Sequence, residues 1–99
     1  MLIIAGHFTV APDKQEAFAA AAKELCAETM KEEGVTFYEF WADLDGSGRY
    51  SVLELWESEA HLERHLATPH VTGFQARGEE LGMENVDIKR YIISEVKPL

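Results

Sequence analysis

The chain has little cysteine, few basic residues and no long hydrophobic run. Its single cysteine, Cys26, cannot form an internal disulfide, and no second thiol completes a CxxC redox or metal motif. The apolar run at the N-terminus is only five residues long and has no basic flank, so we expect neither a signal peptide nor a membrane span. These features favour a protein of the reducing cytoplasm.

The shortage of basic residues bears on possible partners. Nine Lys and Arg face eighteen Asp and Glu, which gives a formal net charge of -9. Such a charge repels phosphate backbones and anionic membrane surfaces, and the basic residues are scattered rather than clustered. We therefore expect no nucleic acid and no membrane among its partners.

What is present is the composition of one folded domain. Hydrophobic residues make up 46% of the 99 residues, with only seven Gly and three Pro. No internal repeat or linker divides the chain, so residues 1–99 are predicted to form a single domain without help from disulfides.

The hydrophobic patterning predicts four strands and three helices. Asp13 and Glu16 form a candidate capping box, Gly34 a helix stop, Asp45–Gly48 a hairpin turn, and Ser58 and Thr68 helix N-caps. The expected strands are residues 2–10, 35–44, 49–58 and 85–96, and the expected helices are residues 14–33, 59–67 and 69–81.

The order β-α-β-β-α-α-β is typical of the ferredoxin-like, split βαβ plan in the α+β class. Such a fold has a four-stranded antiparallel sheet with its helices on one face. Here the strands carry large apolar residues on both faces, as where Phe37 and Trp41 alternate with Tyr38 and Phe40. The uncovered face therefore predicts a homodimer in which two sheets pack together.

Three of the four histidines lie in "WESEAHLERHLATPH", residues 56–70. His61 and His65 have the i, i+4 spacing that can bind one ion, but no third ligand accompanies them, and we predict no metal site. On a helical wheel Leu62 and Leu66 define the buried stripe, which leaves His65 at its boundary and His61 mostly solvated.

His70 falls in the first turn of the next helix, just after Thr68-Pro69. The positive end of the helix dipole there favours a neutral imidazole. Such an imidazole could donate a hydrogen bond to a ligand, or the residue could simply fix the corner between two helices.

Glu54 is an unexpected carboxylate in mid-strand. Alternation places Tyr50, Val52, Glu54 and Trp56 on one face, and burying a carboxylate between Val52 and Trp56 is costly without a partner. If this face meets the helices, His65 is the nearest basic candidate, which a carboxylate would orient as a base. The alternative is a purely stabilising polar contact of Glu54.

The run "LELWESEAHLERHLATPH", preceded by "KEEGVTFYEF", resembles the antibiotic biosynthesis monooxygenase-like family of dimeric α/β barrels, and within it the small quinol monooxygenases. The resemblance covers essentially the whole chain. It implies that an aromatic quinol or phenol binds between sheet and helices and reacts with O₂ without metal, flavin or haem. Trp56, His65 and His70 match the family motif, and Glu54 matches its strand acid.

The sequence therefore predicts a cofactor-independent monooxygenase with His65 as base, Glu54 orienting it and Trp56 as aromatic wall. Two alternatives stay open. One is a non-enzymatic module, binding an aromatic metabolite or acting in a stress response. The other is an isomerase of the autoinducer-processing type, whose phosphorylated substrate would need cations such as Arg77 with Lys89 or Arg90. The expected substrate-binding residues are Tyr50, Val52, Leu62, His70 and Phe74.

Overall fold

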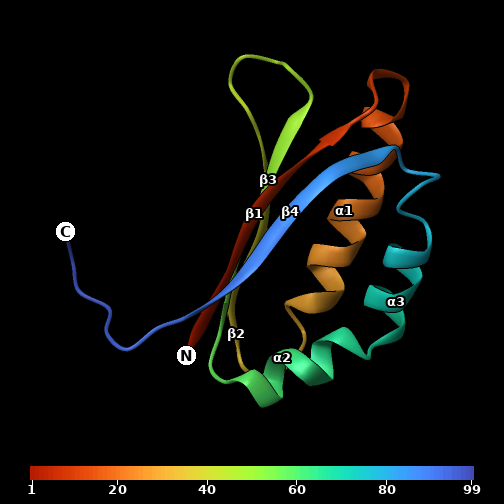
Figure 1. Ribbon diagram of the computed structural model, residues 1–99. Coiled ribbons are helices and arrows are strands. Elements are labelled where there is room, and N and C mark those ends of the chain that lie inside the picture. The colour runs from red at the N-terminus through yellow and green to blue at the C-terminus, as the bar shows by residue number, and fades with distance from the viewer.

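The predicted order of elements and their layering are confirmed in the computed structural model, which describes residues 1–99. Four strands form one antiparallel sheet in the order β2-β3-β1-β4, and the three helices lie on one of its faces (Figure 1). None of the helices has the length and apolar character needed to cross a membrane. The elements are β1 (Leu2–Val10), α1 (Gln15–Thr29), β2 (Val35–Ala42), β3 (Arg49–Trp56), α2 (Glu59–Leu66), α3 (Pro69–Ala76) and β4 (Met83–Ile92).

The core lies between the sheet and the helices because alternate strand residues point toward them. On β1 the buried positions are Leu2, Ile4, Phe8 and Val10. They pack in two apolar clusters, one around Trp56 and Leu62 and one around Phe18 and Leu81.

Both ends of α1 differ from the prediction. Pro12–Lys14 forms a short 3-10 turn, so Asp13 lies inside this turn and Lys14 precedes the helix without a side-chain cap. The prediction that Asp13 and Glu16 form a capping box was wrong. The helix also ends at Thr29 rather than Glu33, and residues 30–34 turn into β2 through Gly34, whose φ is 84°.

The predicted third helix was too long, and the last strand begins and ends earlier than expected. α3 ends at Ala76, not Leu81, and β4 runs from Met83 to Ile92 instead of residues 85–96. Gly78 and Gly82 explain the difference, because glycine weakens a helix and Gly82 adopts a φ of 74°.

Glycine is also required where β4 meets the middle of β1. A Cβ on Gly6 would overlap the carbonyl oxygen of Asp87 and the Cα of Ile88. A register irregularity between His7 and Thr9 lies beside this point. Gly6 therefore lets the backbone of β4 approach β1 closely.

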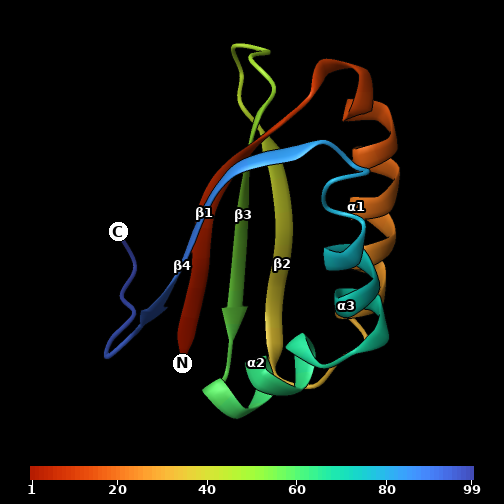
Figure 2. The same cartoon turned by 45° about the vertical axis from the view of Figure 1, so that its right-hand side comes forward.

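The helices leave part of the sheet uncovered at β4. Ile88 pairs with Gly6, and Gly6 pairs with Val52, so Ile88 and Val52 share the face that carries the helices. Yet Val52 is 3% exposed and Ile88 is 38% exposed. The side view shows β4 at the sheet edge and the C-terminal residues extending away from the body (Figure 2). A cavity opens where this coverage ends.

Candidate functional site

A cavity of about 370 Å³ lies between the helix-facing side of the sheet and α2 and α3. Most of its lining is apolar, with a few polar groups at separate points, which is the usual character of a small-molecule site. The polar lining residues are Glu54, His65, Gln75 and Arg90, with the phenol of Tyr38 beside them. The apolar lining includes Ile4, Leu25, Phe40, Val52, Leu62, Leu66, Val71, Phe74, Val86 and Ile88.

Glu54 is buried on the helix-facing side of β3, the orientation that the sequence left open, and lines this cavity. The indole N–H of Trp56 donates a hydrogen bond of 2.8 Å to Oε1 of Glu54. Burial raises the pKa of Glu54 to about 7, although the indole hydrogen bond acts in the opposite direction. The chain thus holds a carboxyl group that can gain or lose a proton near neutral pH on the wall of an apolar cavity.

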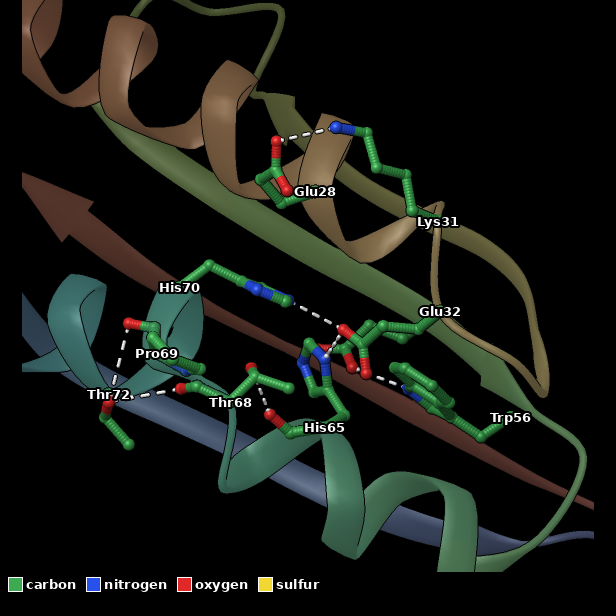
Figure 3. Close-up of polar contacts among 10 residues, drawn as sticks. Glu28, Lys31, Glu32, Trp56, His65, Thr68, Pro69, His70 and Thr72 are labelled. Atoms are coloured by element: carbon green, nitrogen blue, oxygen red, sulfur yellow. Dashed lines mark hydrogen bonds and ion pairs between the residues drawn. The ribbon is translucent and has the colours of Figure 1, made fainter.

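His65 also lines the cavity, but its carboxylate partner was predicted wrongly. Nδ1 of His65 lies 2.7 Å from Oε2 of Glu32 (Figure 3). The side chain of Glu54 instead accepts a hydrogen bond from Trp56. The helical wheel also underestimated the burial of His65, which is 1% exposed rather than at a boundary. Burial lowers the pKa of His65, and the hydrogen bond to Glu32 opposes this shift.

The same oxygen of Glu32 binds a second histidine. Nε2 of His70 lies 2.7 Å from Oε2 of Glu32, so one carboxylate joins the loop after α1 to α2 and to the first turn of α3 (Figure 3). With Nδ1 of His65 donating to Glu32, Nε2 of His65 is left as an acceptor. Two imidazole nitrogens and a carboxylate oxygen are also donor types that bind divalent metals.

Glu32 was missed by sequence reasoning. It lies in the acidic run "KEEG", which looks like the solvated end of a helix. Only the early end of α1 at Thr29 places Glu32 in a loop, where its side chain turns back toward the two histidines. No spacing signal connects it with residues 33 and 38 positions further along the chain.

The other predicted residues divide into those that line the cavity and those that do not. Val52, Leu62 and Phe74 line it. Tyr50 instead lines a separate hollow beside α1 and β2. His70 lies between α1 and α3, in a separate pocket that Phe74 also lines.

Trp56 and His61 do not line the cavity. The indole of Trp56 is fully buried, with its ring centre 4.6 Å from that of His65, so it backs the polar groups rather than forming the cavity wall expected of it. His61 is half-buried, and its Nδ1 lies 2.6 Å from Oγ of Ser58. That serine caps α2 as predicted by accepting a hydrogen bond from the backbone N–H of His61.

Comparisons with known proteins agree with the resemblance seen in the sequence. Residues 1–77 match the family described as "Antibiotic biosynthesis monooxygenase". The Bacillus subtilis protein named "Putative monooxygenase YcnE" is 32% identical over 95 residues, covering 96% of this chain and all of that protein.

Two solved structures share the fold. PA3566 from Pseudomonas aeruginosa has 32% sequence identity and a TM-score of 0.81, with 94% of each chain covered. Rv0793 from Mycobacterium tuberculosis has 23% identity and a TM-score of 0.87, with 98% of each chain covered. From its sequence match over residues 1–77 and these relatives, the chain belongs to the antibiotic biosynthesis monooxygenase family.

Proposed function

We propose that the protein is a cofactor-independent monooxygenase that oxidises a quinol-like or phenolic aromatic with O₂. The observation that carries this proposal is Glu54, a buried carboxyl group with a pKa of about 7 on the wall of an apolar cavity. An electron-rich phenol becomes a far better electron donor when it loses its proton. A base and an apolar cavity that limits water are therefore the main requirements.

The reaction balances without an outside reductant. A hydroquinone, C₆H₆O₂, and O₂ give a hydroxylated quinone, C₆H₄O₃, and water, so the quinol supplies all the electrons. One oxygen atom enters the ring and the other leaves as water. Two hydroxyl protons must leave the substrate during this oxidation, and two residues with proton-accepting side chains, Glu54 and His65, line the cavity.

The hydrogen bonds of the site suggest different roles from those predicted from sequence. Glu54 is the better candidate for the first base, because its pKa lies near neutral while that of His65 is lowered. Trp56 is a positioning residue that holds the carboxylate of Glu54. Glu32 positions His65. Val52, Leu62 and Phe74 would contact the ring of the substrate.

Oxygen uptake with a panel of hydroquinones tests this function. We expect Glu54→Gln to lower the turnover rate by roughly 10²- to 10⁴-fold, the usual contribution of a general base. The wild-type rate should rise with pH through an apparent pKa near 7, as Glu54 ionises. His61→Ala is the matched control on the same stretch of chain, and its rate should equal the wild-type rate.

Two results would contradict the proposal. Equal rates for wild type and Glu54→Gln would remove Glu54 from the mechanism. Quenching of tryptophan fluorescence by a quinone, without oxygen uptake above background for any quinol, would instead favour the non-enzymatic binding module.

The isomerase alternative finds less support in the cavity. Arg90 is the lining residue with a permanent positive charge, and its guanidinium already binds Glu59 at 3.1 Å and Glu63 at 2.9 Å. Arg77 instead lines the separate pocket between α1 and α3, together with His70. A phosphorylated substrate would therefore meet the carboxyl of Glu54 without a free cation to balance it.

We also propose that the protein is a homodimer that works in the cytoplasm. The face of the sheet opposite the helices carries Ile3, Phe37 and Leu55 side by side across three strands, with Trp41 and Tyr91 more than half exposed. A second copy of this face would cover these residues. The lone Cys26 is free, as suits a reducing compartment.

A further inference from the structure

Three side chains that are far apart in sequence bring metal-binding atoms together outside the apolar part of the cavity. Oε2 of Glu32, Nδ1 of His65 and Nε2 of His70 all lie within 4.8 Å of one another. Glu32 comes from the loop after α1, His65 from α2 and His70 from the first turn of α3 (Figure 3). The convergence is therefore tertiary and was not visible in the i, i+4 spacing of His61 and His65.

These atoms have the chemistry of a site for a divalent transition metal. Two imidazole nitrogens and one carboxylate oxygen form a common set of protein ligands for Zn²⁺ and for Co²⁺, its spectroscopic substitute. With three protein ligands, water completes the coordination shell. His65 is 1% exposed, so one ligand is rigidly held by its surroundings.

Metal binding requires the ligand atoms to shift. Ligand atoms about 2.0 to 2.1 Å from a tetrahedral ion lie roughly 3.4 Å from one another. Oε2 of Glu32 now lies 2.7 Å from each histidine nitrogen, so the carboxylate must withdraw by well under 1 Å. The two histidine nitrogens lie within 4.8 Å of each other, so they must approach by up to about 1.4 Å, and the side chain of His70, which is 21% exposed, can make that movement. Glu32 lies in a loop and its side chain is 16% exposed, which leaves room for that movement.

We propose that Glu32, His65 and His70 form a binding site for one divalent transition-metal ion of the Zn²⁺ class. The ion replaces the hydrogen bonds between Glu32 and the two histidines, and it links α2 and α3 to the loop after α1. His61 does not belong to the site, because its Nδ1 is engaged with Ser58. This inference does not depend on the proposed oxidation, which we assign to the metal-free form.

Titration of chelator-treated protein with Co²⁺, followed by its visible ligand-field bands, tests the site. We expect one Co²⁺ per chain, displaced by an equivalent of Zn²⁺. Affinity should fall as the pH is lowered, because protons compete for the histidine nitrogens. His70→Ala and Glu32→Gln should each weaken binding about tenfold or more, since each removes or weakens one of three ligands.

Matched controls separate this site from other acids and histidines nearby. His61→Ala and Glu33→Gln change the same residue types on the neighbouring surface and should leave Co²⁺ affinity unchanged. Circular dichroism checks that each variant is folded. Unchanged Co²⁺ affinity in both His70→Ala and Glu32→Gln would overturn the proposal. Loss of Co²⁺ binding in His61→Ala would also overturn it, because it would indicate that the ion binds the i, i+4 pair His61 and His65. No enzymatic activity enters this test, so its outcome is separate from that of the oxygen-uptake experiment.

Discussion

Glu54 and Glu32 show how differently two glutamates of one chain behave at the scale of single residues. Glu54 lies on a strand among apolar side chains and has one hydrogen-bond donor, Trp56, so burial dominates and its pKa rises. Glu32 lies in a loop and accepts from two imidazoles. The alternation of β3 predicts that Glu54 shares a strand face with Val52 and Trp56, because strand periodicity is local. It says nothing of Glu32, whose partners come from other elements.

The raised pKa of Glu54 predicts how the free energy of unfolding depends on pH. A carboxyl group whose folded pKa, about 7, lies above its unfolded value near 4.5 keeps its proton in the folded state. Its contribution to stability is therefore full below pH 4.5 and is lost as the pH rises to about 7. Relative to Glu54→Gln, the wild type should lose about 3 kcal/mol of unfolding free energy between pH 4.5 and 8.

Urea unfolding of both proteins across this pH range measures that difference. The comparison with Glu54→Gln cancels the titration of the histidines, which both proteins share. Glu39→Gln removes a carboxylate from the opposite face of the sheet and is the control for loss of charge alone. A difference between wild type and Glu54→Gln that does not change with pH would show that Glu54 is not buried as a neutral acid.

At the scale of elements, the positions of the site residues depend on where α1 and α3 end and where the edge strand β4 begins. α1 stops early enough to release Glu32, and α3 stops early enough to let β4 begin at Met83. The patterns predicted each element correctly, because helical and strand periodicity are local. They missed both ends of α1 and the end of α3, where turns compete with helix over a few residues and the outcome depends on packing against the rest of the fold.

The close approach of β4 to β1 depends on Gly6. We expect Gly6→Ala to lower the unfolding free energy by roughly 1 to 3 kcal/mol, the usual cost of overpacking, because the new methyl overlaps the backbone of Asp87 and Ile88. Because Ile88 lines the cavity, displacement of β4 should also weaken the binding of an aromatic ligand there.

Thermal and urea unfolding measure the effect, and Gly73→Ala is the matched control. Gly73 lies in α3 with open space around its Cα, so alanine there should be neutral or stabilise the protein by up to about 1 kcal/mol. Equal stability of Gly6→Ala and wild type would show that β4 can move away without cost.

At the scale of the whole molecule, the sheet is covered on one side only. The helices lie over one face of the sheet (Figures 1 and 2). The other face carries half-buried apolar side chains and the exposed rings of Trp41 and Tyr91. Apolar residues on both parities of the strands indicate this from sequence, since a face meant for water would carry polar side chains.

Light scattering at micromolar concentration tests the dimer. We expect a mass twice the 11.1 kDa of one chain, and a monomer mass for Leu55→Lys, which places a charge among Ile3 and Phe37. Ala20→Lys, on the exposed side of α1, should remain a dimer. A monomer mass for the wild type would contradict the packing of two sheets.

The sequence by itself determined the order of the elements, the ferredoxin-like plan, the two apolar faces of the sheet and the strand face that Glu54 shares with Trp56. All of these follow from periodicity within one segment and from the small number of ways to pack such segments. Only the tertiary structure decided which groups meet. Glu32 joins His65 and His70 across distant parts of the chain, and Trp56 holds Glu54. Hydrogen bonds between elements depend on where helices end and how side chains turn, which local patterns do not contain.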